Sequence, residues 1–194
     1  MKHQLTRDDL LPVAEYIKVR GERRRSIIAQ KERRRLDVGP VATIYFESFD
    51  SMWLQVQEML YIEKGGEAQI EDELQAFNPL IPQGSELVAT VMFEIDEPLR
   101  RKAFLSRLGG VEETAFIRLG EEMVKGVPEA DVDRTNAAGK ASSVQFIHFP
   151  FTAAQIAKFR RPGAQVIVGF SHPNYGHMVM MPEAVRAALA EDFD

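Results

Sequence analysis

Residues 18–35 are the most strongly charged stretch of the chain, and their charge limits where they can lie in any fold. Nine of the 24 Lys and Arg residues fall within this stretch, and only Glu22 and Glu32 oppose them, so it carries about +7. The whole chain carries −5, so the other residues carry about −12. The charge asymmetry favours contact with something negative, either the protein's own acidic body or a partner.

The composition is that of one globular domain. A chain of 194 residues, 45% hydrophobic and 27% charged, fits a single domain over residues 1–194. Cysteine is absent, which excludes disulfides, thiol catalysis and cysteine-ligated zinc or iron–sulfur sites. The N-terminus becomes charged at once, and no apolar run approaches the roughly 18 residues of a membrane span. We therefore expect a cytoplasmic protein without a membrane segment.

Helical signals dominate the first third of the chain. Thr6 and Asp9 form a capping-box pattern, which predicts a first helix from Thr6 to about Ile17. A second, basic helix is expected over residues 19–35, ending before the Val-Gly-Pro sequence at 38–40. A strand over residues 41–47 and two further helices over 50–63 and 67–77 follow from their β-branched content and apolar spacing.

The second half of the chain is richer in strands. They are expected at residues 86–95, 114–119, 122–125, 143–149, 164–171 and 177–181. Helices are expected at 97–108, 152–159 and from Pro182 onward, and a long surface loop at about 126–140. Neighbouring strands joined by short turns predict an α+β fold, a mostly antiparallel sheet with packed helices. Residues 1–36 would form an N-terminal helical, Arg-rich part and residues 37–194 an α+β body, with a homodimer possible through the apolar strand at 88–95.

The basic segment supplies the candidate binding residues. On a helical wheel six cations share one broad face with Ile27. They are Arg20, Arg23, Arg24, Lys31, Arg34 and Arg35. Guanidinium groups bind carboxylate and phosphate through paired hydrogen bonds, so this face suits an anion. It fits a solvated face paired with local carboxylates, a docking site for an acidic protein, or a site for nucleic acid or a nucleotide. A pI of 5.5 argues against nucleic acid.

Three histidines form the second candidate site. If residues 173–176 are the loop of a hairpin, His172 and His177 face each other across two strands. They would form a metal site if His148 or a carboxylate supplied a third ligand, although no pattern identifies that ligand. We favour the other interpretation, a polar hairpin end with one histidine satisfied by hydrogen bonds, and therefore predict no metal site.

No catalytic motif is present, which favours a role other than catalysis. The sequence lacks a phosphate-binding Gly-rich loop, a dinucleotide fingerprint, His-Glu-x-x-His and Gly-x-Ser-x-Gly. It also lacks the Glu-x-x-His pairs of di-iron bundles. Glu58, on a helix whose other face is apolar, is expected to pair with the basic helix.

Several phrases resemble an uncharacterised bacterial family known only as a domain of unknown function. They are LTRDDL at residues 5–10, the Arg-rich helix running into VGP at 38–40, QVQEML at 55–60, NPLIP at 78–82, SSVQFIHF at 142–149 and HPNY at 172–175. The resemblance spans nearly the whole chain. It implies genes that lie near those of rubrerythrin-like peroxide-reducing proteins and iron–sulfur oxidoreductases, and it assigns no catalytic residues.

These observations favour an accessory or interaction protein of redox or oxidative-stress metabolism. In this hypothesis the Arg-rich helix docks on an acidic protein, such as a rubrerythrin-like or iron–sulfur oxidoreductase partner. The alternatives are a metal-binding protein or metal-dependent enzyme using His148, His172 and His177, and a nucleic-acid or nucleotide binder using the same helix. A further alternative is that the Arg-rich helix only packs on the protein's own acidic surface. The cofactor is not determined by the sequence.

Overall fold

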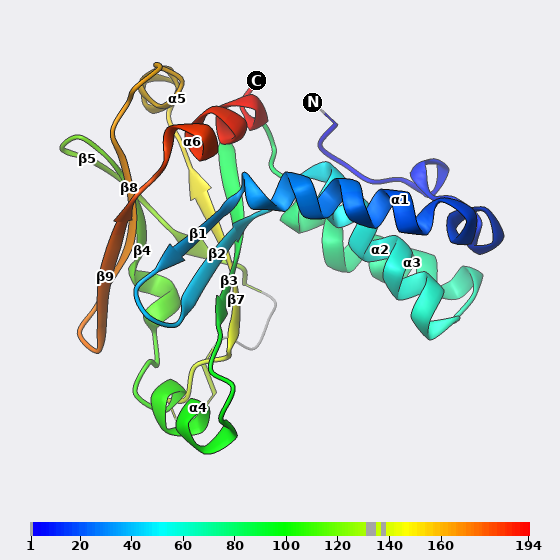
Figure 1. The fold of residues 1–194 in the computed structure, drawn as a ribbon, viewed down its shortest axis with the longest axis horizontal. Helices are drawn as coiled ribbons and strands as arrows, with labels where there is room; N and C mark the ends of the chain where they lie inside the picture. Colours follow the sequence, from blue (N-terminus) through cyan, green and yellow to red (C-terminus); the bar gives the residue numbers. More distant parts are fainter. Residues whose placement is uncertain (1, 131–134, 137–138) are drawn as a thin grey trace.

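The structure, a computed structural model, describes residues 2–130, 135–136 and 139–194. Within these residues it contains six α-helices and nine β-strands (Figure 1). The helices are α1 (Val13–Glu32), α2 (Phe49–Glu63), α3 (Glu67–Phe77), α4 (Pro98–Leu105), α5 (Ala153–Phe159) and α6 (Glu183–Leu189). The strands are β1 (Arg35–Val38), β2 (Ala42–Phe46), β3 (Glu86–Phe93), β4 (Ala115–Leu119), β5 (Glu122–Lys125), β6 (Val127–Pro128), β7 (Val144–Pro150), β8 (Val166–His172) and β9 (Tyr175–Met180).

Two antiparallel sheets face each other and enclose the main core. One sheet has the order β1-β2-β3-β7-β6 and the other β5-β4-β8-β9. Alternate residues of each strand point inward, such as Val91 on β3 and Val168 on β8, which are both fully buried. The predicted α+β class is confirmed, with two packed sheets instead of one.

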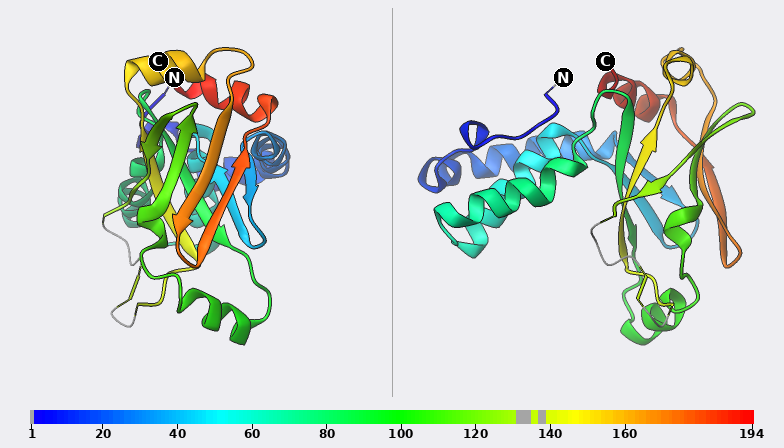
Figure 2. Two further views of the ribbon diagram at one scale, coloured as in Figure 1. Left: turned by 90° about the vertical axis from the view of Figure 1, so that its left-hand side faces the viewer. Right: turned by 180° about the vertical axis from the view of Figure 1, so that it is seen from behind.

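The first three helices form a lobe beside the sandwich (Figures 1 and 2). The lobe has its own apolar cluster, which includes Leu5, Val56 and Leu74 and reaches Val88 on the outer face of β3. Seen from the side of β9, the lobe lies behind the sandwich (Figure 2, left). The Arg-rich helix packs on α2, which in turn packs on α3, so it does not form a unit by itself.

The predicted N-terminal helices differ from the observed ones. The Thr6–Asp9 capping box is present, but it caps a single 3₁₀ turn over Arg7–Asp9. One continuous helix, α1, then begins after Pro12. The prediction of two helices was wrong. Pro12 has no N–H to donate and fits directly before a helix, so the helix starts after Pro12 and not at Thr6.

In the second half, β3 lies in the middle of its sheet, paired with β2 on one side and β7 on the other. It therefore has no free edge through which a dimer could form. The predicted loop at 126–140 is interrupted by β6, which pairs with β7. Residues 131–134 and 137–138 of that prediction lie outside the described residues.

A tyrosine joins the two sheets where β1 and β9 approach each other. The buried Tyr175 hydroxyl donates to the Val38 carbonyl at 2.6 Å and accepts from the Ala42 N–H at 3.0 Å. Gly39, in the turn between β1 and β2, has a φ of +73°, and a Cβ there would lie 2.6 Å from Cγ of His177. This turn therefore requires glycine for both its backbone conformation and its packing.

Candidate partner-binding site

The helix α1 is unusually exposed for its length. Of its 20 residues, all of them described, only Tyr16 and Ile27 are buried. Tyr16 packs edge-on against Trp53 and Tyr61 of α2, with ring centres 5.9 and 6.4 Å away. A helix normally buries a continuous apolar stripe. Most of the surface of α1 is thus left available for other contacts.

Arg20 faces inward and is held by α2. Its Nε and Nη2 each donate to a carboxylate oxygen of Glu58 at 2.8 Å, and its guanidinium lies 4.6 Å from the centre of the Tyr61 ring. The Tyr16 hydroxyl donates to the same carboxylate. Hydrogen bonding by Arg20 holds the pKa of Glu58 below its ordinary value. The predicted pairing of Glu58 with the basic helix is confirmed.

Three more of the predicted cations contact aromatic rings of the protein itself. The Arg23 guanidinium lies 5.3 Å from the centre of the Trp53 ring. The Lys31 ammonium lies 5.9 Å from the Tyr45 ring, and the guanidinium of Arg35 5.6 Å from it. Arg35 belongs to β1, not to the helix, and also donates to the Asp37 carboxylate. Cation–π contacts take up part of the charge of these side chains.

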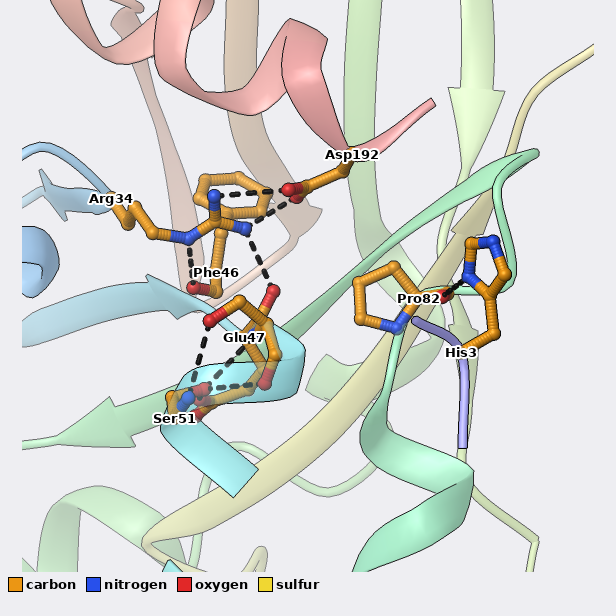
Figure 3. Close-up of polar contacts among 8 residues, drawn as sticks. His3, Arg34, Phe46, Glu47, Ser51, Pro82 and Asp192 are labelled. Atoms are coloured by element: carbon orange, nitrogen blue, oxygen red, sulfur yellow. Dashed lines mark hydrogen bonds and ion pairs between the residues drawn. The ribbon is translucent and has the colours of Figure 1, made fainter. Parts of the chain in front are cut away.

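Arg34 lies inside the protein (Figure 3). Its Nη1 donates to Asp192 Oδ1 at 3.0 Å, and its Nη2 donates to Oδ2 of the same carboxylate. Its Nε donates to the backbone carbonyl of Phe46 at 3.0 Å, and its Nη2 also donates to that of Glu47 at 2.8 Å. Arg34 is 9% exposed and Asp192 1%. Burial raises the pKa of the Asp192 carboxyl, and the Arg34 guanidinium opposes that rise.

A polar cleft of about 520 Å³ opens above this ion pair. It is lined by residues from the N-terminus, α1, α2 and the C-terminal turn, including Lys2, Arg33, Asp50 and Glu191. Beside it, the buried Glu47 carboxylate accepts from the hydroxyls of Ser51 at 2.6 Å and Thr90 at 2.7 Å. His3 is placed nearby, with Nδ1 2.6 Å from the Pro82 carbonyl (Figure 3). Cationic and anionic residues balance in this cleft, so its charge selects no particular ligand.

The outward face of α1, by which we mean Ile17, Gly21, Arg24, Arg25 and Ile28, makes none of these hydrogen bonds, ion pairs or ring contacts with the described residues. These residues are spaced three, four and seven apart, so they share one side of the helix. Ile17 is 54% and Ile28 57% exposed. Within the described part of the chain, Arg24 and Arg25 form no hydrogen bond or ion pair with a carboxylate, although the charge of Arg24, after that of Arg20, contributes to lowering the pKa of Glu58.

Of the six predicted binding cations, Arg24 is thus the one on this outward face. Arg20, Arg23, Lys31 and Arg35 contact the protein's own side chains, and Arg34 is buried. The prediction did not include Arg25, Ile17 or Ile28. The spacing from Ile17 to Arg24 and Ile28 was a usable signal, but dividing the segment into two helices hid it.

The three candidate metal ligands are not brought together. His148 is on β7, where its ring lies between two carboxylates, with Nδ1 3.0 Å from Glu86 and Nε2 3.0 Å from Glu129. Hydrogen bonding by Glu86 is the main cause that raises the pKa of His148. One carboxylate on each ring nitrogen is the geometry of an ion-paired imidazolium. In a metal site, by contrast, the imidazole and the carboxylates would converge on one point. Across the described residues, no group of three or more His, Asp or Glu is arranged to hold a metal ion.

His172 and His177 belong to the other sheet. The hairpin turn has two residues, not four, so His172 pairs with Tyr175 and His177 with Phe170. The turn is tight because His172 Nδ1 accepts from the Asn174 N–H at 3.2 Å and the Asn174 side chain donates to the Arg107 carbonyl at 2.9 Å. His177 packs on Tyr175, with ring centres 4.6 Å apart. The direct pairing of the two histidines, which depended on a four-residue loop, is therefore not formed.

Comparison with known proteins identifies the family but not a function. The sequence matches the family described as "Protein of unknown function (DUF3501)" over residues 4–193. The chain belongs to this family. A crystal structure of a novel protein of unknown function from Burkholderia pseudomallei is similar, with 38% sequence identity and a TM-score of 0.91. That similarity covers 98% of this chain and 100% of the other. No curated protein matches the chain.

The resemblance noted from the sequence phrases is thus confirmed, and the DUF3501 fold is shared with a solved bacterial protein. No described helix of this DUF3501 protein is long and apolar enough to cross a membrane.

Proposed function

We propose that this DUF3501 protein is an accessory protein that binds an acidic partner protein through the outward face of α1. The observation that carries the proposal is the exposure of Arg24 and Arg25 and their lack of ion pairs within the described part of the chain. They are exposed, form no hydrogen bond or ion pair with a carboxylate among the described residues, and are flanked by exposed isoleucines. Arginine beside exposed apolar side chains is typical of protein interfaces.

A protein partner fits this surface better than nucleic acid. Strong binding to nucleic acid needs many phosphate contacts along a continuous cationic track. Here Arg20 is neutralised by Glu58 and Arg34 by Asp192. Two adjacent arginines between apolar residues are complementary in charge to a compact acidic patch on a protein. Candidate partners are the rubrerythrin-like and iron–sulfur oxidoreductase proteins that the family resemblance implies, and the cytoplasm is the proposed compartment.

The proposal is tested by affinity purification from the native host, with mass spectrometry, of the wild type and Arg24→Glu/Arg25→Glu. A matched control is Arg100→Glu/Lys102→Glu, which reverses two exposed cations on α4. We expect the partner to be lost with the first variant and kept with the control. Arg34 is left unchanged because its reversal would place an unpaired charge inside the protein. If both variants recover the same proteins as the wild type, the proposal is wrong.

A further inference from the structure

A groove at the far end of the helical lobe continues the outward face of α1. It has a volume of about 500 Å³ and lies between the start of α1 and the ends of α2 and α3. Its walls are mainly apolar and include Leu10, Leu11, Val13, Leu60 and Ile70. Val13 is 40% exposed and stands one turn before Ile17. The groove and the outward face therefore form one surface, about 22 Å long from Val13 to Ile28 at the helical rise.

The charges around this surface are positive on balance. Lys64 lies on the rim of the groove and ends α2 with a φ of +57°. The other two charged residues of the rim, Arg7 and Glu67, pair with each other. Adding Arg24 and Arg25, the surface offers three cations without an ion pair among the described residues. Such a surface favours an acidic occupant over a second copy of the same basic helix.

A second feature of the outward face is the glycine at its centre, Gly21. It sits in the middle of an exposed helix, where glycine costs about 1 kcal/mol relative to alanine. A Cβ at this position would meet nothing closer than Arg25 Nη1 at 3.7 Å, so the fold itself does not require glycine. Small residues at the centre of a helix face allow the backbone of another helix to approach closely.

We infer that the outward face of α1 and the groove together bind an acidic amphipathic helix of the partner protein. The helix crosses α1 at Gly21, places a bulky apolar side chain in the groove and directs carboxylates toward Arg24, Arg25 and Lys64. An apolar anchor flanked by charge pairs is the usual form of helix-in-groove recognition. This inference rests on the proposed function and specifies the kind of partner segment.

Photo-crosslinking in the native host tests the inference, with benzoylphenylalanine at Ile17 as the probe and at Met123, on β5, as the control position. The cross-linked peptide is identified by mass spectrometry. Three variants are compared: Val13→Glu, which puts a carboxylate in the groove, Gly21→Gln, which blocks close approach, and Leu99→Glu as an exposed control on α4. Glutamate at the first residue of α1 is favourable for the helix, and Gly21→Gln raises helix propensity, so both variants are expected to fold.

We expect capture of an acidic, amphipathic helical segment from Ile17 but not from Met123. The yield should fall by about tenfold or more in Val13→Glu and in Gly21→Gln, as for loss of a central contact, and stay unchanged in Leu99→Glu. Capture that is lost in Arg24→Glu/Arg25→Glu, included as a fourth variant, but kept in Val13→Glu and Gly21→Gln would leave the docking proposal standing and overturn the inference. Capture of a second copy of this chain, or of nothing, would overturn both.

Discussion

Arg34 and Asp192, separated by 158 residues in sequence, form a buried ion pair that joins the end of the Arg-rich segment to the C-terminal turn. Each nitrogen of the Arg34 guanidinium donates at least one hydrogen bond to a carboxylate or carbonyl oxygen. Such a pair is expensive to break, because the partner that remains is a buried charge without compensation.

We therefore predict that Arg34→Ala destabilises the protein by about 3–5 kcal/mol. The neighbouring Arg35→Ala, which removes an exposed pair with Asp37, should cost less than about 1 kcal/mol. Chemical denaturation of the two variants provides the comparison. Equal stability of the two would mean that the Arg34–Asp192 pair does not hold the two parts of the chain together.

A second prediction concerns the turn between β1 and β2. Gly39 and Gly120 both have positive φ values, +73° and +63°, but only at Gly39 would a Cβ meet other atoms within 4 Å. Gly120→Ala should cost about 1–2 kcal/mol for the backbone conformation alone. Gly39→Ala should cost about 1–3 kcal/mol more from overpacking against His177 and Tyr175. Adding His177→Ala to Gly39→Ala should recover part of the loss, and the absence of any recovery would exclude this contact as the cause.

A third prediction is a pH dependence that arises from His148. Its pKa is raised in the folded protein by the carboxylates of Glu86 and Glu129. A raised pKa means that the stabilisation is complete below the unfolded value of about 6.5 and is lost as the pH rises through the folded value. The wild type should thus exceed His148→Gln in stability by more at pH about 6 than at pH about 9. Denaturation of both proteins across this range measures the difference. If the difference in stability between the two proteins stayed the same across this pH range, a charged His148 would not be the source of the stabilisation.

The fourth prediction concerns Glu58. Arg20 is the main cause that lowers its pKa, so Arg20→Gln should raise that pKa, whereas Arg25→Gln, which removes an outward cation, should not. A lowered carboxyl pKa stabilises the fold above the unfolded pKa of about 4.3, and this contribution is lost as the pH falls through the folded value. NMR titration of the Glu58 side-chain carboxyl in the two variants gives the answer. An equal change of the Glu58 pKa in the two variants would show that Arg20 is not the specific cause of the lowered pKa.

The sequence by itself determined most of the elements, although it did not indicate the single helix α1 or the short strands β1 and β6. The α3 boundaries at 67–77 and the β5 boundaries at 122–125 were predicted as observed, because apolar periodicity and Gly or Pro breakers act over a few residues. The α+β class followed from the order of these elements. Motif phrases also identified the family, although the family carries no assigned function.

Tertiary structure decided which cations are available for binding. A helical wheel treats Arg20, Arg24 and Arg34 as equivalent, since it contains no information about what packs against the helix. In the folded chain Arg20 pairs with Glu58 and Arg34 with Asp192, whereas Arg24 forms no ion pair among the described residues. Both acidic partners are distant in sequence, so their positions depend on chain topology and not on local spacing. The same reason separates His148 from His172 and His177, which lie on different sheets.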